Sequence, residues 1–138
     1  MVVRLAHVCI ETDDFDPCEE FYGYLGINRQ FEFRNKQNEL VGVYLSIGET
    51  TYIEIIKVKN PLSKGNMRHF ALQVEDVEAT RELLMSRGIE VTEKELGIDH
   101  TLMVTCHDPN GNFIEFHQYT NKSMQQQGGV CEIDYTPK

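Results

Sequence analysis

Two glutamates lie in the middle of stretches that otherwise read as β-strands packed on a core. Glu54 lies within TYIEIIK, residues 51–57, and Glu115 within NFIEFHQ, residues 112–118. Their neighbours are largely β-branched or aromatic, as in strands that cover a hydrophobic core. A carboxylate buried in such a strand is costly unless it is hydrogen-bonded, paired with a cation or bound to a metal. Two glutamates in matching settings therefore indicate a shared role.

Two histidines have nearly the same spacing as the glutamates. His7 lies in RLAHVCIE and His69 in MRHFALQV, 62 positions later, and the glutamates are 61 positions apart. The spacing of 62 also matches Asp14 with Asp76, Phe21 with Leu83, Gly26 with Gly88 and Ile27 with Ile89. A repeat of this length indicates a duplicated supersecondary unit. Two imidazoles and two carboxylates at matching positions of such units would suit a divalent first-row metal.

The elements that position these four residues follow the same order in both repeats. Acidic residues at Asp14 and Asp76 would each cap a helix, and Gly26 and Gly88 would end those helices in a left-handed conformation. Strands are then expected at 29–34, 40–47 and 51–58 in the first repeat, and at 89–94, 101–107 and 112–119 in the second. This order predicts an α+β fold made of two tandem βαβββ modules.

Alternation within the strands places both glutamates on one kind of face. Residues two apart in a strand share a face, so Glu54 lies opposite the aliphatic Ile53 and Ile55, and Glu115 lies opposite Ile114 and Phe116. If the apolar faces pack against the helices, both carboxylates point to the other side of the sheet.

The composition fits one compact domain. The chain has 138 residues, of which 41% are hydrophobic and 25% charged, and its net charge of −9 argues against nucleic acid or anionic membrane as a partner. We expect one domain over residues 1–119, with modules at 1–59 and 66–119 and a linker at 60–65. Residues 120–138 read as a flexible extension, in which Val130 to Tyr135 alternate and could add an edge strand. No apolar run is long enough to cross a bilayer, and the start of the chain lacks a signal peptide's apolar region, so a cytoplasmic location is expected. The four cysteines (Cys9, Cys18, Cys106 and Cys131) show no metal-binding spacing and are expected to be reduced.

The repeat, the four polar residues and the ending DPNGNFIEF resemble the vicinal oxygen chelate superfamily over about residues 3–119. That group includes glyoxalase I, extradiol dioxygenases, methylmalonyl-CoA epimerase and the fosfomycin and bleomycin resistance proteins. The order His, Glu, His, Glu is closest to glyoxalase I of the short bacterial kind. The resemblance implies that His7, Glu54, His69 and Glu115 are metal ligands in a curved mixed sheet around a pocket.

Glyoxalase I isomerises the adduct of a 2-oxoaldehyde such as methylglyoxal and a thiol to a 2-hydroxyacyl thioester. The resemblance thus implies a metal-dependent lyase of the lactoylglutathione lyase type, in which the metal acts as a Lewis acid on an enediolate. Glu115 would move the proton, with Glu54 balancing it on the opposite side. Nickel, cobalt or zinc is favoured as the metal, and manganese or iron would also fit. Small members of the superfamily often pair their units across two chains, which implies a homodimer with a small-molecule substrate.

Three other activities within the superfamily stay open. An extradiol dioxygenase needs two histidines, one carboxylate and open positions on iron, and Glu54 would crowd that site. An epimerase of the family has glutamine where this chain has Glu54. A drug-binding resistance protein needs no metal, so four filled ligand positions argue against that function.

Further residues near the four ligands are open to two interpretations. His117 shares the face of Glu115 and is either a hydrogen-bond donor to it or an exposed histidine without a role. Cys9 shares the face of His7 and either lines the pocket or is a small core residue. His100 and His107 fall in or beside turns and are more readily structural than functional.

The thiol is the point at which the sequence departs from glutathione-using glyoxalases. By resemblance, an arginine four residues after the first histidine would pair with a glutathione carboxylate, but this chain has Glu11 there. Where an asparagine is expected four residues past the second ligand, the chain has Val58. A carboxylate in place of a guanidinium repels an anionic ligand. We therefore expect a substrate other than the glutathione adduct, such as another thiol conjugate or a different 2-oxo compound.

Overall fold

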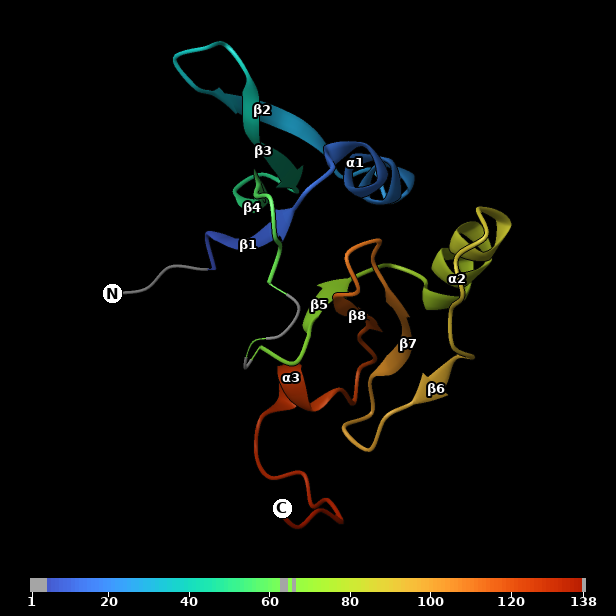
Figure 1. Ribbon diagram of the computed structural model, residues 1–138. Coiled ribbons are helices and arrows are strands. Elements are labelled where there is room, and N and C mark those ends of the chain that lie inside the picture. Colours follow the sequence, from blue (N-terminus) through green and yellow to red (C-terminus); the bar gives the residue numbers. More distant parts are fainter. Residues whose placement is uncertain (1–4, 63–64, 66, 138) are drawn as a thin grey trace. The chain divides into compact units, whose positions relative to one another are not determined.

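The computed structural model describes residues 5–62, 65 and 67–137, and the chain divides into two compact units, Met1–Asn66 and Met67–Lys138 (Figure 1). Residues 63 and 64 of the expected linker, and residue 66, where the second module was expected to begin, lie outside the described residues. Within the described part of the chain, no helix is both long and apolar enough to span a membrane.

The first unit is a four-stranded mixed sheet with one helix. Its elements are β1 (His7–Thr12), α1 (Phe15–Tyr24), β2 (Asn28–Arg34), β3 (Leu40–Ile47) and β4 (Thr51–Lys57). The strand order is β1-β4-β3-β2, in which β1 runs parallel to β4 and the other neighbours are antiparallel. The buried core combines residues of the helix with alternate residues of β3 and β4: Phe15, Cys18, Phe21, Tyr22, Val43, Leu45, Ile53 and Ile55.

The second unit repeats this topology. Its elements are β5 (Phe70–Gln73), α2 (Val77–Ser86), β6 (Glu95–Leu96), β7 (Leu102–His107) and β8 (Phe113–Gln118), followed by the short helix α3 (Met124–Gln127). The strand order β5-β8-β7-β6 again sets the first strand parallel to the last. The prediction of an α+β fold with two tandem βαβββ modules is confirmed.

The predicted helix boundaries are confirmed at both ends. The Asp14 side chain accepts a hydrogen bond from the Asp16 amide at 3.1 Å. The Asp76 side chain accepts two, from Glu78 at 2.9 Å and Ala79 at 3.0 Å. Gly26 and Gly88 follow the helices with φ of 75° and 79°, a conformation that glycine adopts without a steric penalty.

The strand expected at 89–94 does not form, and pairing with β7 begins only at β6. Thr92 explains the difference. Its amide donates to the Thr105 carbonyl at 3.0 Å, but the Thr105 amide donates to the Thr92 hydroxyl at 2.8 Å. The side chain thus takes the place of the backbone carbonyl that would continue a ladder.

The C-terminal segment differs from the sequence expectation in two ways. Residues 120–127 were expected to be flexible but include α3. They are held to the loop before β7 by a hydrogen bond of 2.9 Å between the buried hydroxyls of Thr101 and Ser123. Met124 also donates its amide to the Asp99 carbonyl at 2.9 Å. The edge strand expected at 130–135 does not form, and the Cys131 thiol instead donates to the Ile98 carbonyl at 3.5 Å.

The capping contacts generate a stability prediction. Replacing Asp76 with alanine removes an acceptor for two backbone amides and should lower the free energy of unfolding by about 0.5–2 kcal/mol. Urea unfolding followed by circular dichroism measures the change. Glu75→Ala, at the exposed neighbouring position, is the control and should change the value by less than about 0.5 kcal/mol. Equal losses for both variants would contradict a capping role for Asp76.

Candidate functional site

The first unit brings His7 and Glu54 together. Parallel pairing of β1 with β4 sets Cys9 opposite Glu54 and His7 opposite Tyr52, so all four residues lie on one face of the sheet. The His7 Nε2 lies 3.2 Å from the Glu54 Oε2. The pair therefore arises from strand register. His7 lies opposite Tyr52, and its imidazole extends to the Glu54 carboxylate, two residues further along β4.

The second unit forms the equivalent pair from His69 and Glu115. His69 immediately precedes β5, which runs parallel to β8. Its Nε2 lies 3.5 Å from the Glu115 Oε2. A second imidazole reaches the same oxygen, because His117 Nε2 lies 2.8 Å from it. Of the two interpretations of His117, the structure favours the hydrogen-bonding partner of Glu115.

The predicted division of faces is confirmed in both units. Ile53, Ile55, Ile114 and Phe116 are fully buried. The glutamate side chains on the other face keep 19% exposure at Glu54 and 17% at Glu115. The carboxylates thus point away from the core into positions that are partly shielded from water and still accessible.

The chemistry and spacing of the donors in each pair fit a divalent metal. Metal bonds to imidazole nitrogen and carboxylate oxygen are about 2.0–2.2 Å long, so adjacent donors on one ion lie about 3 Å apart. The His7–Glu54 and His69–Glu115 separations of 3.2 and 3.5 Å are close to this value. Each pair supplies two donors, and no group of three or more ligand side chains that could hold an ion occurs among residues 5–62, 65 and 67–137.

Tyr44 is a site residue that the sequence analysis did not identify. It lies directly opposite Glu54 on β3, and its hydroxyl donates a hydrogen bond to the Glu54 Oε2 at 3.3 Å. The same hydroxyl lies 3.5 Å from the His7 Nδ1. Partial burial and then the Glu54 charge raise the pKa of the Tyr44 phenol, which keeps it a donor. The register of the β3–β4 hairpin is the feature that could have indicated Tyr44, because it places Tyr44 opposite Glu54.

Cys9 lies on the same sheet face as His7 and Glu54. This agrees with its interpretation as a residue that lines the site, rather than as a small core residue. Burial raises the pKa of the Cys9 thiol, and the Glu54 and Glu11 carboxylates raise it further. Glu11 itself accepts a hydrogen bond from the Leu62 amide at 3.3 Å. The first unit therefore presents two carboxylates on the face of His7, Glu54 in contact with it and Glu11 further along β1, and this favours neutral or positively charged groups on that face.

The remaining histidines have other surroundings. His107, at the end of β7, is exposed, and its ring lies 5.2 Å from that of Phe113. The His100 carbonyl accepts hydrogen bonds from the Thr120 and Ser123 hydroxyls at 2.7 and 3.1 Å. His100 thus helps to hold the C-terminal segment, as expected of a structural residue.

A comparison with known families places the whole site within one of them. The family model described as Glyoxalase/Bleomycin resistance protein/Dioxygenase superfamily matches residues 4–116, a range that contains all four expected ligands. The chain belongs to this superfamily. The resemblance to the vicinal oxygen chelate group is thereby confirmed. A separate comparison with curated proteins found no match.

Solved structures show the same fold. The structure of SMU.1112c is 28% identical with a TM-score of 0.71, and the match covers 86% of this chain and 100% of that one. A glyoxalase family protein from Enterococcus faecalis is 24% identical with a TM-score of 0.70, covering 83% and 97%. A bleomycin-binding protein complexed with bleomycin is 20% identical with a TM-score of 0.65, covering 86% and 100%. The last two likenesses concern the fold alone. The superfamily contains enzymes and also proteins that bind bleomycin without catalysis.

Proposed function

We propose that the protein is a metal-dependent glyoxalase-like lyase. Its reaction would move a proton between adjacent carbons of a 2-oxoaldehyde thiol adduct or a related 2-oxo compound. The observation that carries the proposal is the His–Glu pair in each unit, with donor separations of 3.2 and 3.5 Å. An ion pair that only stabilises one unit would not have to recur in the other. A ligand set divided between two modules, in contrast, needs a His–Glu pair in each.

In this proposal His7, Glu54, His69 and Glu115 hold one divalent ion, with nickel, cobalt or zinc favoured and manganese or iron possible. When bound, the ion supplies Lewis acidity toward a carbonyl oxygen. This Lewis acidity would act on a substrate that has a carbonyl and a neighbouring oxygen.

The surroundings of the two glutamates support Glu115 as the proton carrier. Two imidazoles reach the Oε2 of Glu115, from His69 at 3.5 Å and from His117 at 2.8 Å, whereas only one imidazole of the described residues, that of His7, reaches Glu54. An imidazole can donate to a carboxylate or accept from a carboxylic acid, which suits a residue that takes up and returns a proton. Glu54 instead accepts a hydrogen bond from the Tyr44 hydroxyl and lies opposite Cys9 on the neighbouring strand. The neutral phenol donor holds the Glu54 carboxylate in place, which suits a residue that stays a ligand throughout.

Metal binding is the first test. His69→Ala or Glu115→Ala should weaken binding of nickel or cobalt at least about 100-fold, since even the loss of a group that supports a ligand costs about 10- to 100-fold. Calorimetric titration of chelator-treated protein measures this, with metal content per chain as a second readout. His107→Ala is the control, because it removes an exposed histidine of the same unit. A His7→Ala/Glu54→Ala double variant that binds metal like the parent would show the four-ligand set to be wrong.

Turnover is the second test and distinguishes a lyase from a protein that only binds. Glu115→Gln should lower kcat for methylglyoxal–thiol adducts by about 10²–10⁴ on metal-loaded protein. With glutathione as the thiol, we expect the parent's kcat/KM to lie below about 10⁴ M⁻¹s⁻¹, the lower end of the usual enzyme range. Glu11→Arg should raise it, whereas Glu49→Arg, at an exposed turn, should not.

Two results would contradict this reading of the substrate. A parent value within about 10⁴–10⁸ M⁻¹s⁻¹ would show that glutathione is accepted and that Glu11 is a bystander. No turnover of any thiol adduct by fully metal-loaded protein would argue for binding without catalysis.

We also propose that the protein is a homodimer and acts in the cytoplasm, as the family resemblance and the composition imply. Sedimentation velocity at micromolar concentration should give twice the mass of the 138-residue chain. A monomer that carries full metal and activity would contradict the dimer.

A further inference from the structure

Aromatic side chains gather beside His7 on the sheet of the first unit. We define the aromatic face as Phe31, Phe33, Tyr44 and Tyr52. The Phe31 ring stacks on Tyr44 with centroids 4.5 Å apart and planes at 18°. The Phe33 ring meets both of these rings nearly edge-on, at 5.3 and 5.8 Å. Tyr52 lies 5.8 Å from Tyr44. These contacts hold the four rings in one connected set.

The aromatic face continues directly into the His–Glu pair. Strand register sets Phe31 opposite Tyr44, and Tyr44 opposite Glu54. The His7 ring lies 5.4 Å from that of Tyr44. A molecule that reaches the His7–Glu54 pair therefore lies next to these rings.

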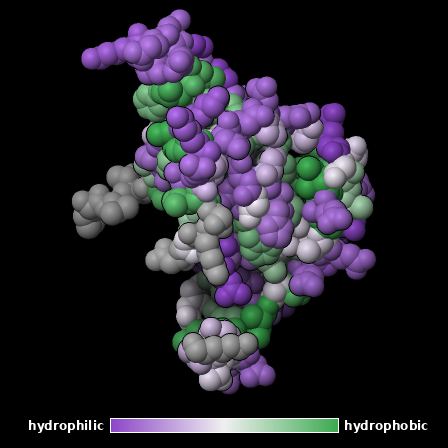
Figure 2. All heavy atoms as spheres, viewed as in Figure 1, coloured by the Kyte–Doolittle hydropathy of each residue, from purple (hydrophilic) through white to green (hydrophobic). Residues whose placement is uncertain are grey.

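Two of these rings are unusually open to solvent. Phe31 is 44% exposed and Phe33 is 43% exposed. In Figure 2, apolar atoms lie just below the polar tip of the β2–β3 hairpin. Large aromatic side chains exposed side by side usually mark a binding surface.

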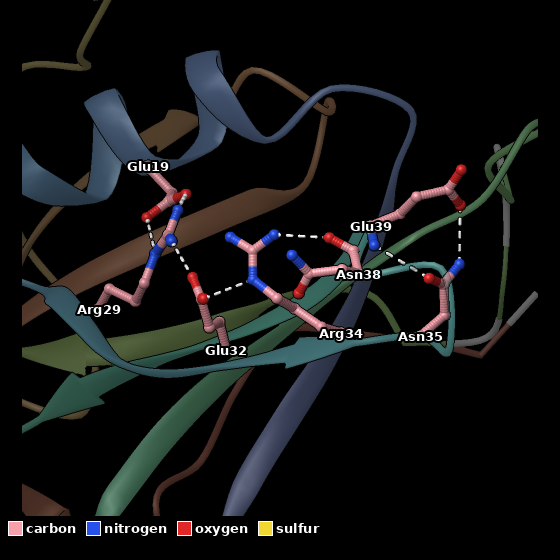
Figure 3. Close-up of polar contacts among 7 residues, drawn as sticks. All are labelled: Glu19, Arg29, Glu32, Arg34, Asn35, Asn38 and Glu39. Atoms are coloured by element: carbon pink, nitrogen blue, oxygen red, sulfur yellow. Dashed lines mark hydrogen bonds and ion pairs between the residues drawn. The ribbon is translucent and has the colours of Figure 1, made fainter.

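The other side of β2 shows that the exposed rings are not a core face turned outward by accident. There Arg29 forms ion pairs with Glu19 of α1 and with Glu32, and Arg34 Nε donates to Glu32 at 2.8 Å (Figure 3). The strand therefore has its charges on the side of the helix and its rings on the side of the site. This reverses the usual arrangement, in which the helix side of a sheet is apolar.

Gly42 is the position that lets Phe33 lie flat on the sheet. It pairs with Phe33 in the register of β2 and β3. A Cβ added at Gly42 would lie 3.0 Å from the Phe33 Cδ2 and 3.4 Å from the Ile55 carbonyl oxygen. Any larger residue would push the ring away from the backbone. The glycine thus builds the aromatic face as a shallow platform.

The charges around this platform limit what it can bind. Glu11 and Glu54 share its side of the sheet, and both act on the Cys9 thiol. Of the basic side chains near it in sequence, Arg29 and Arg34 form the ion pairs above and Lys57 Nζ lies 5.8 Å from the Phe15 ring of α1. Lys36 lies in the turn between β2 and β3, beyond the strand residues that carry the rings. Aromatic ring faces also attract cations. Repulsion of anions and attraction of flat cations therefore act together.

We propose that the aromatic face is a subsite for a planar aromatic group that is neutral or positively charged. This inference rests on the proposed function only in taking that group to be part of the substrate. Its ring would stack on Phe31 or Phe33, which places the rest of the molecule beside Tyr44, His7 and Glu54.

The test uses three two-ring probes that differ in charge: N-methylquinolinium, 2-naphthol and 2-naphthoate. Each is titrated into the full-length, chelator-treated protein by calorimetry, and ring-current shifts of Phe31 and Tyr44 are followed by NMR. The cation and the neutral probe should bind at one site per chain. The anion should bind at least about tenfold more weakly, as expected for like charges a few ångströms apart near a protein surface.

Variants then locate the bound ring. Phe31→Ala and Phe33→Ala should each weaken the cation and the neutral probe by about 2- to 10-fold, the range of one aromatic contact. Phe31→Leu should lose affinity although it stays apolar, and Phe31→Tyr should retain it. Gly42→Ala should weaken binding without removing any ring. Met85→Ala, at a 47% exposed apolar position on α2, is the matched control and should have no effect.

The outcomes separate this inference from the proposed function. Equal affinity for the three probes, no binding by any of them, or binding unchanged in Phe31→Ala/Phe33→Ala would overturn the subsite even if metal binds as proposed. Loss of self-association in that double variant, with no probe bound by the parent, would show instead that a second copy of the chain covers the rings. Probe binding as expected in a protein that holds no metal would keep the subsite and remove the lyase.

Discussion

The structure depends on one constraint in each unit: a carboxylate in the middle of an interior strand must not be buried without a polar partner. Glu54 and Glu115 lie on β4 and β8, each flanked by two other strands, and the alternate residues of both strands are fully buried. A slip of one residue would turn the carboxylate into the core and the aliphatic side chains out of it. The parallel pairing of β1 with β4, and of β5 with β8, fixes the register and brings an imidazole to each carboxylate. The hydrophobic core thus determines the polar geometry.

The two units have the same topology, but their polar surroundings differ. Opposite the glutamate, the first unit has Cys9 and Tyr44, whereas the second has Ala71 and Thr105. The second unit adds His117, which has no polar equivalent in the first, because Ile56 occupies the matching position. The first unit therefore combines a firmly held carboxylate with an aromatic face, and the second combines a carboxylate with two imidazoles. Under the proposed function, this division would assign recognition to the first module and proton transfer to the second.

Much of this arrangement could be predicted from the sequence, because it follows from repetition and alternation. The repeat of His7 and Glu54 at His69 and Glu115 predicted the βαβββ order and the four residues that form the two pairs, and the acidic caps marked the helix starts. The failures have local causes. A threonine hydroxyl replaced a ladder bond at 89–94, and buried hydroxyls held a C-terminal segment whose composition suggested flexibility. Tyr44 was missed because its role depends on cross-strand register, which hydrophobic periodicity does not reveal.

Tyr44 connects recognition with chemistry, because its ring and its hydroxyl serve different neighbours. The ring supports the stacked Phe31, and the hydroxyl donates to Glu54 beside His7. A planar group resting on Phe31 would cover this side of the sheet and remove water from the polar pair, which keeps 38% exposure at His7 and 19% at Glu54. Electrostatic interactions strengthen as water is excluded. Binding of the correct ring would therefore tighten the contacts that hold Glu54 in place, whereas a ligand without a ring would leave them in water. Selectivity for an aromatic group and orientation of Glu54, the proposed metal ligand, would in this way depend on one side chain.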